Sequence, residues 1–274
     1  MQNPQSLRNN MSLSNNNPEF TFEPVGYVRC GQKYRSEAPR QGVFAENEGI
    51  IRLEKGKNFE QALTDLKGFS HIWVIFCFHL NDNWKPLVQP PVVGQKKKVS
   101  VFATRSPHRP NSIGMSCVEL VEIDGLDVHI RNFDMLNDSP VLDIKPYIPR
   151  VDSFPDAQIG WLEKAKLNSY QISFSDIAEE QMLWLEKQIG LDLKSFCEVQ
   201  LKHDPVNSSR KRIEDKGQDE YIIFCRTWQI HFSLDEKNTE IHINFLKSNY
   251  TSEDLSAGAP DPYSDKDIHR EFII

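Results

Sequence analysis

Apolar and polar positions between Phe20 and about Tyr147 recur mostly with the two-residue period of β-strands. The runs FTFEPVGYVR and GIIRL predict two strands. The run HIWVIFCFHL, from His71 to Leu80, is almost unbroken in its apolar character, which predicts a strand buried on both faces. This part of the chain is therefore expected to be mainly β.

One helix and one hairpin are predicted within the same region. The helix combines a capping-box pattern, an apolar stripe and a C-terminal glycine, formed by Asn58 and Gln61, by Phe59, Ala62, Leu63 and Leu66, and by Gly68. In CVELVEIDGLDVHIRNFD, the dipeptide Asp124-Gly125 favours a type I′ turn between two strands. After the turn, Val128 and Ile130 alternate with polar residues, so His129 is expected on the wet face. Many strands with one helix among them favour a small closed antiparallel or mixed barrel.

The pattern changes from about Ser173. Ser175 is a good N-cap for a helix whose apolar stripe ends at Gly190, and a second helix is expected over 191–202. The runs YIIFCRTWQIHFSL and TEIHINFLK predict two strands around the loop DEKN. We therefore predict a disordered tail over 1–19, a barrel domain over 20–160, a small α+β domain over 161–248, and a polar, disordered tail over 249–274.

Composition limits the function classes. The chain has 274 residues, 39% of them hydrophobic, and lacks both a membrane-length apolar run and a signal-peptide core, so we expect a cytoplasmic protein. Its five cysteines form no CxxC pair and its histidines no metal-binding pattern, which predicts reduced thiols and no metal. The net charge of −7 argues against a nucleic-acid partner, but the acidity lies in residues 161–274, with 21 acidic and 14 basic residues. Arg29, Lys33, Arg35 and Arg40, and Lys96 to Lys98, are basic clusters, and ordinary solvated surface is the favoured interpretation of each.

Common catalytic motifs do not identify a reaction. The patterns GxGxxG, GxxxxGK[ST] and GxSxG are all missing from the sequence, which leaves dinucleotide enzymes, P-loop proteins and serine hydrolases of the usual types without support.

The loop VFATRSPHRPNSIGMS, from Val101 to Ser116, is the strongest candidate for a ligand site. Two prolines stiffen it, while Arg105, Arg109 and Asn111 offer donors to a carboxylate, a phosphate or a base edge. The alternative is that an arginine here only ties down loop carbonyls.

The stretch NFDMLNDSPVLDIKPYIP, from Asn132 to Pro149, carries a second polar group of residues. If Asp134 and Asp138 were buried they would need partners, and the upstream arginines could provide them. An ordinary turn with solvated acids is the alternative.

These blocks together resemble a known family. APRQGVF, GFSHIWVIFCFH, VFATRSPHRPNSIGMSCVEL and DMLNDSPVLDIKPYIP, spread in order over about residues 22–158, are similar to the motifs of the TsaA-like, or TrmO-type, family. The resemblance implies a small β-barrel that uses S-adenosylmethionine to methylate N6 of threonylcarbamoyladenosine at tRNA position 37. It also implies a homodimer that completes the cofactor site.

The resemblance further implies site residues. Cofactor contacts would come from Arg40, Gln41, Gly42, His79, Leu80, Arg105, Met115, Asn132, Phe133, Asp134 and Met135. A direct displacement at the methyl carbon needs positioning and a base for the N–H proton, for which Asp134, Asp138 and Asp143 are candidates. Candidate tRNA contacts are Arg109, Lys145, Tyr147, Lys96, Lys97 and Lys98.

The chain departs from the family pattern at three places, of which the first two are conservative in turn geometry and the third, in the C-terminal region, leaves substrate choice open. The family usually reads NPIG at 111–114 and DGTP at 137–140, where this chain reads NSIG and NDSP. It also reads DPRPAY where this chain has HDPVNSSRKR, beginning at His203. The alternatives are a non-catalytic S-adenosylmethionine- or RNA-binding module on the same barrel, and a methyltransferase with another substrate.

Overall fold

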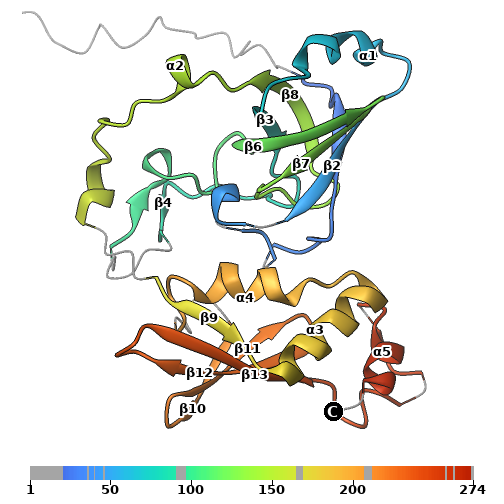
Figure 1. The fold of residues 1–274 in the computed structure, drawn as a ribbon, viewed down its shortest axis with the longest axis vertical. Coiled ribbons are helices and arrows are strands. Elements are labelled where there is room, and N and C mark those ends of the chain that lie inside the picture. The colour runs from blue at the N-terminus through green and yellow to red at the C-terminus, as the bar shows by residue number, and fades with distance from the viewer. Residues whose placement is uncertain are drawn as a thin grey trace, which may run out of the picture.

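The protein consists of a closed barrel followed by a five-stranded sheet with helices (Figure 1). The structure, a computed structural model, describes residues 21–272 except 36, 40, 46, 91–96, 165–168, 207–211, 257 and 262. The predicted tail 1–19 lies outside the described residues.

Six antiparallel strands close the barrel in the order β1-β2-β7-β6-β3-β8, with β8 pairing back onto β1. The strands are β1 (Gly26–Arg29), β2 (Glu48–Leu53), β3 (His71–Cys77), β6 (Ile113–Asp124), β7 (Asp127–Arg131) and β8 (Pro140–Pro146). Short elements lie in the connections: η1 (Gly42–Phe44), α1 (Phe59–Ala62), η2 (Thr64–Leu66), β4 (Leu87–Val88), β5 (Val99–Ser100), η3 (Val101–Ala103), α2 (Pro149–Asp152) and η4 (Gly160–Lys164). The predicted mainly β fold with a small closed barrel is confirmed.

Alternate residues of the strands fill the barrel, as the two-residue period requires. Val28, Ile51, Val118, Val128 and Ile130 are almost completely buried. The prediction for β3 is wrong in one respect, because Ile72, Val74 and Phe76 are buried while the alternate residues are only half-buried. In a single barrel only one face of a strand points into the core.

Two local predictions also differ in detail. The β6–β7 turn consists of Gly125 and Leu126, because Asp124 pairs with Asp127, and only Gly125 has a positive φ, of 57°. This pattern fits a type II′ turn better than type I′. The predicted helix at Asn58 is a single turn followed by η2, and the Asn58 side chain bonds to Gln61 without capping a backbone N–H.

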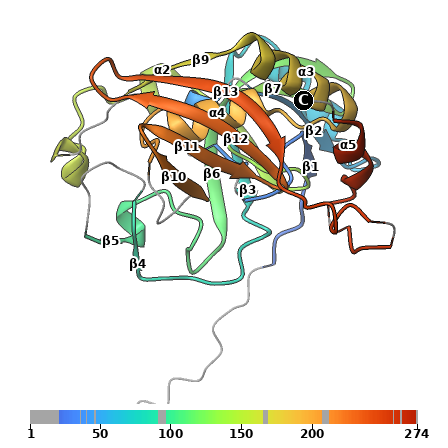
Figure 2. The ribbon, with the colours of Figure 1, turned by 90° about the horizontal axis from the view of Figure 1, so that it is seen from below.

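The second unit contains the strands β10 (Ile213–Gly217), β11 (Glu220–Cys225), β12 (Trp228–Asp235), β13 (Glu240–Ser248) and β9 (Gln171–Phe174), in that order across the sheet. The run from Tyr221 to Leu234, predicted as one strand, forms parts of β11 and β12 with a turn at Arg226 and Thr227. Helices α3 (Asp176–Ile189) and α4 (Leu193–Leu201) complete the predicted α+β unit. Figure 1 shows α4 between this sheet and the barrel, and Figure 2 shows the sheet from below.

The caps of α3 follow the sequence signals. The Ser175 hydroxyl accepts the N–H of Ala178, and Gly190 ends the helix in a left-handed conformation. Met182 and Leu185 face the core of this unit, as predicted.

The prediction of a disordered tail over 249–274 is wrong for its described part. This segment contains α5 (Lys266–Glu271), and the His269 ring is buried and stacked on Trp228 at a centroid distance of 3.7 Å. Phe272 packs against the same tryptophan. Apolar anchors spaced among polar residues thus attach the segment to the sheet.

No helix in the described ranges is long and apolar enough to cross a membrane. All five cysteines are free thiols, with Cys197 and Cys225 buried and Cys30, Cys77 and Cys117 half-buried.

Candidate functional site

One rim of the barrel collects most of the predicted site residues. Because neighbouring strands are antiparallel, the ends of β1, β3 and β7 lie beside the starts of β2, β6 and β8. The connections 30–47, 78–112 and 132–139 therefore meet at this rim, which faces the second unit (Figure 1). They contain every predicted cofactor residue except Met115, which lies near the start of β6.

Asn47 joins the first and third of these connections. Its buried side chain donates from Nδ2 to the Phe133 carbonyl and accepts the Phe133 N–H at Oδ1, both at 3.0 Å. Its own carbonyl accepts the N–H of Asn132, whose φ is 60°. Three hydrogen bonds thus fix the 132–133 backbone.

Gly42 lies directly against the same backbone. A Cβ atom at this position would stand 2.3 Å from the Asn132 carbonyl oxygen and 2.8 Å from the Phe133 Cα, closer than side-chain carbons approach backbone atoms. Glycine is therefore required for the close approach of the two chain segments. The structure thus brings Gln41 and Gly42 beside Asn132 and Phe133.

Asp134 is a half-buried carboxylate of the rim. Ser116 Oγ, from β6, donates a hydrogen bond to Asp134 Oδ1. Burial raises the pKa of Asp134 above its usual value, and the Ser116 hydrogen bond and the charge of Arg105 offset only part of that rise. Such a carboxyl group is a stronger base than an exposed one.

The other two candidate bases already have cationic partners at the surface. Asp138 forms an ion pair with Arg29 and accepts a 2.7 Å hydrogen bond from Asn137 Nδ2. Asp143 pairs with Lys145 at 2.6 Å and accepts the N–H of Ile144. Asp134, in contrast, has a serine hydroxyl as its partner, and burial raises its pKa.

The 101–116 loop uses its two arginines differently. Arg109 Nη1 donates to the carbonyls of Val101 and Thr104, at 3.2 and 2.9 Å, so this arginine ties down loop carbonyls as the alternative interpretation supposed. Arg105 is exposed, and its charge acts on both Asp134 and Cys117. Met115 projects from β6 with 55% of its surface exposed. Arg105 and Met115 thus have side chains available to a ligand.

Other predicted cofactor residues are placed less favourably for side-chain contact. Phe133 and Met135 are 0% and 1% exposed in the barrel core, so their side chains cannot contact a ligand, and both backbone polar groups of Phe133 are already bonded to Asn47. His79 lies 3.4 Å from the Ser139 hydroxyl, and partial burial lowers its pKa, which favours a neutral ring. Leu80, beside it, is 37% exposed.

The predicted tRNA contacts fall in two places. Lys97 and Lys98 are exposed in the 78–112 connection. Lys145 and Tyr147 lie at the far end of β8, where Tyr147 packs edge-on against Trp73 at 5.8 Å. Arg40 and Lys96 lie outside the described residues.

Asn47 and Ser116 were not recognised as site residues from the sequence. Asn47 stands in ENEG, an ordinary polar turn pattern, and Ser116 alternates with apolar residues along a strand. Only the pairing of distant segments reveals their partners, 86 and 18 positions away.

Comparisons with known proteins agree with this architecture. Residues 27–153 match the family described as tRNA-methyltransferase O N-terminal domain. The chain is 34% identical over 229 residues to the tRNA (adenine(37)-N6)-methyltransferase of Escherichia coli K12, a match that covers 81% of this chain and 96% of that protein. The human protein of the same name is 40% identical over 231 residues, which are 81% of this chain and 51% of the human one.

A solved structure shares the fold. The crystal structure of TrmO from Pseudomonas aeruginosa superposes with a TM-score of 0.61 and 26% identity, over 84% of this chain and 97% of that one. Since the bacterial relative matches over nearly its whole length and the barrel matches the N-terminal domain, this chain belongs to the TrmO family of tRNA (adenine(37)-N6)-methyltransferases.

Proposed function

We propose that this protein transfers a methyl group from S-adenosylmethionine to N6 of the adenosine at tRNA position 37, in its threonylcarbamoyl form. The observation that carries the proposal is the rim, where the 30–47, 78–112 and 132–139 connections meet. They bring together the half-buried carboxylate of Asp134, the exposed Arg105 and a fixed backbone wall formed by residues 41–42 and 132–133. The relatives named for this activity support it.

The residues of the rim fit a bound S-adenosylmethionine. When bound, the cofactor supplies a methyl carbon made electrophilic by its sulfonium. The 41–42 and 132–134 backbone offers N–H and carbonyl groups other than the Asn132 N–H and the Phe133 groups, which Asn47 occupies. Arg105 can meet the cofactor's carboxylate, and Met115 offers an apolar contact. The Asp134 carboxylate would stand near the positive sulfur, which favours binding.

Asp134 is the proposed base. The acceptor nitrogen belongs to a urea-like group, so its lone pair is delocalised and it must lose a proton as the new N–C bond forms. Asp134 would accept that proton at a carboxylate oxygen, while the fixed wall holds the reacting groups in line. Ser116 keeps the carboxylate oriented through its hydroxyl.

The tRNA would approach over the same rim. Lys97 and Lys98 would contact phosphates, and the exposed Arg105 could serve phosphate or cofactor. Lys145 and Tyr147 lie farther along β8, and we retain them as contacts only for a tRNA that extends over the outer face of the barrel.

We also propose that the protein is a homodimer that acts in the cytoplasm. Large apolar side chains are exposed on the 78–112 connection and on β6 beside it: Trp84 at 55%, Leu87 at 51%, Phe102 at 73%, Ile113 at 40% and Met115 at 55%. A second copy packed on this face would bury them and complete the cofactor site. Sedimentation of the purified protein should give a mass of two chains, and a monomer would contradict this part of the proposal.

Two experiments test the function. Calorimetry with S-adenosylmethionine should detect binding by the wild type and at least about 10-fold weaker binding by Arg105→Ala. The matched control is Arg52→Ala, which removes an arginine paired with Asp127 at the other end of the barrel. Unchanged binding by Arg105→Ala contradicts the site.

Nucleoside mass spectrometry of tRNA from a deletion strain should lack the methylated threonylcarbamoyladenosine, and plasmid-borne wild type should restore it. An unchanged nucleoside profile contradicts the proposed reaction. Cofactor binding without any transfer would favour the non-catalytic module.

A further inference from the structure

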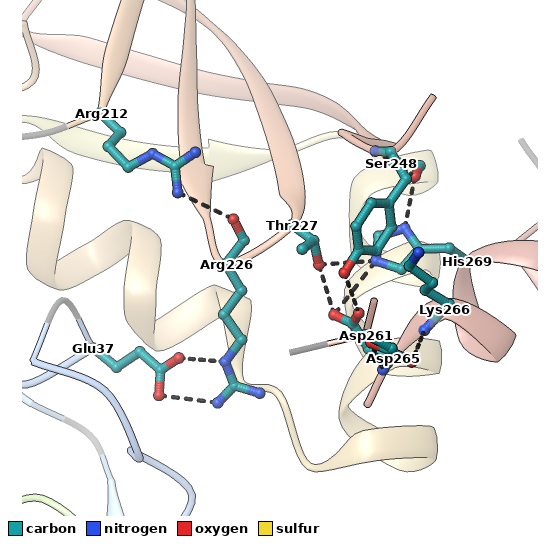
Figure 3. Close-up of polar contacts among 10 residues, drawn as sticks. Glu37, Arg212, Arg226, Thr227, Ser248, Asp261, Asp265, Lys266 and His269 are labelled. Carbon is teal, nitrogen blue, oxygen red and sulfur yellow. Dashed lines mark hydrogen bonds and ion pairs between the residues drawn. The ribbon is translucent and has the colours of Figure 1, made fainter. Parts of the chain in front are cut away.

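The second unit is joined to the 30–47 connection by a nearly buried ion pair. Arg226 donates from Nε to Glu37 Oε1 at 2.5 Å and from Nη2 to Oε2 at 3.0 Å, and the two side chains are only 10% and 5% exposed (Figure 3). A forked arginine–carboxylate pair of this kind fixes direction as well as distance. The pair therefore sets where the connection lies relative to the second unit.

Glu37 also organises the connection itself. Its Oε2 accepts the N–H groups of Lys33 and Tyr34, at 2.8 and 3.3 Å. The Arg226 guanidinium lies over the Tyr34 ring at 4.8 Å. One carboxylate thus holds the fold of the loop and its attachment to the second unit.

The backbone at Arg226 indicates that this side chain is specifically needed. Arg226 is the first residue of the two-residue turn between β11 and β12, and its φ is 52°. Glycine is the usual residue at such a left-handed turn position, and any other residue adopts it at a cost. A strained arginine whose guanidinium reaches another domain is explained by the contact that it makes there.

The next residue of the turn connects to the C-terminal segment. Thr227 Oγ1 donates to Asp265 Oδ2 at 2.6 Å and lies 2.9 Å from His269 Nε2, and His269 Nδ1 lies 2.7 Å from the Ser248 hydroxyl (Figure 3). Tyr263 from this segment packs edge-on against Tyr34 at 5.4 Å. The segment 249–272 thus contacts both the β11–β12 turn, at Thr227, and the 30–47 connection, at Tyr34.

The geometry points to Glu37 and Arg226 as positioning residues through which the second unit holds residues 41–42, one half of the backbone wall that 41–42 and 132–133 form. Glu37 lies five positions before Gly42, whose backbone is pressed against Asn132. Loss of the ion pair frees the 30–47 connection from the second unit, so the wall is formed in only a fraction of the molecules. The apparent Kd for the cofactor then equals the intrinsic Kd divided by that fraction. This inference rests on the proposed function.

The test uses the full chain and the variants Glu37→Gln, Arg226→Met and the double variant. Each single variant should raise the Kd and KM for S-adenosylmethionine about 10-fold, which corresponds to a wall formed in about a tenth of the molecules. The kcat at saturating cofactor should stay within about 2-fold, because the bound cofactor restores the wall. The double variant should also show about a 10-fold effect, since both residues act through one contact.

Controls separate this role from a purely structural one. Asp127→Asn and Arg52→Met break another forked ion pair on the barrel, away from the rim, and should leave KM unchanged. Arg226→Lys, which keeps the charge, should recover part of the affinity. Amide hydrogen exchange should quicken in the 41–45 backbone of Glu37→Gln and not in β3, a readout that needs no activity.

Three results would overturn the inference. If KM is unchanged in both single variants and only the melting temperature is lowered, the ion pair stabilises the fold and does not position the cofactor site. Multiplied effects of about 100-fold in the double variant would show that the two residues act independently. A wild type that binds no cofactor would overturn the proposed function together with the inference, whereas an active wild type with unaffected variants would overturn the inference alone.

Discussion

Asn47→Ala should loosen the segment that carries Asp134. The side chain is 4% exposed and satisfies both backbone groups of Phe133, which is itself fully buried. Truncation leaves a buried N–H and a buried carbonyl without partners, and each such group costs about 1–3 kcal/mol. We therefore expect the free energy of unfolding of the barrel to fall by about 3 kcal/mol.

Urea denaturation at pH 7 measures this loss, followed by the tryptophan fluorescence of the chain, to which Trp73 in β3 contributes from the barrel. Asn83→Ala is the matched control, because Asn83 is exposed and accepts one hydrogen bond, from His108 Nδ1 at 2.8 Å. It should change stability by less than about 0.5 kcal/mol.

The variant Asn47→Asp refines the argument. It keeps the acceptor for the Phe133 N–H but, once ionised, has no proton to donate to the Phe133 carbonyl. It should therefore be destabilised at pH 7 and recover toward wild type in acid, where the carboxyl is protonated. A loss below about 1 kcal/mol in Asn47→Ala would refute the claim that these hydrogen bonds hold the wall.

Three further predictions concern Asp134, Gly42 and Ser175. Asp134→Asn should lower kcat about 10²- to 10⁴-fold in a methyl-transfer assay, the usual loss for a general base, and a near-normal kcat would exclude that role. Burial raises the pKa of Asp134 in the folded protein, so the wild type loses stability as pH rises from the unfolded pKa near 3.8 through the raised folded pKa. Asp134→Asn lacks this loss. Its stability relative to the wild type should therefore increase across that pH window and level off above it. Gly42→Ala would bring a Cβ within 2.3 Å of the Asn132 carbonyl oxygen. It should weaken cofactor binding about 10-fold by calorimetry and lower the free energy of unfolding by about 1–3 kcal/mol. A variant that binds the cofactor like the wild type would mean that the loop adjusts freely. Ser175→Ala removes the N-cap of α3 and should cost about 1 kcal/mol in chemical denaturation while cofactor binding stays unchanged, so altered binding would show that α3 is coupled to the rim.

Local patterns in the sequence determined the elements and the kind of fold. The two-residue alternation around Val128 and Ile130 placed β7 with its apolar face inward, and Ser175 and Gly190 marked the ends of α3. These predictions succeeded because periodicity and caps depend on neighbours in the chain. The prediction for β3 failed because an unbroken apolar run does not say how many of its faces are covered.

The candidate site was determined in part by motif resemblance and in part only by the tertiary structure. The resemblance implied Arg105 and Asp134 as cofactor contacts and Asp134, Asp138 and Asp143 as candidate bases, without choosing among the three bases. Antiparallel pairing of the strands then brought three distant connections to one rim and placed Asp134, half-buried, beside Ser116. Burial of a carboxyl group depends on all the segments around it, so no local pattern could predict it.

The attachment of the second unit was likewise decided by tertiary structure alone. Glu37 and Arg226 are 189 positions apart. Glu37 stands in a polar stretch that reads as surface, and Arg226 lies within the run from Tyr221 to Leu234 that was predicted as one strand, so the sequence does not pair them. The segment 249–274 was predicted to be disordered because its composition is polar. In its described part, however, the aromatic rings of His269 and Phe272 pack on Trp228 and that of Tyr263 packs on Tyr34. The sequence by itself therefore determined the strands, the helices and the motif-bearing loops, whereas contacts between distant segments decided which of their polar residues are buried, paired or available for chemistry.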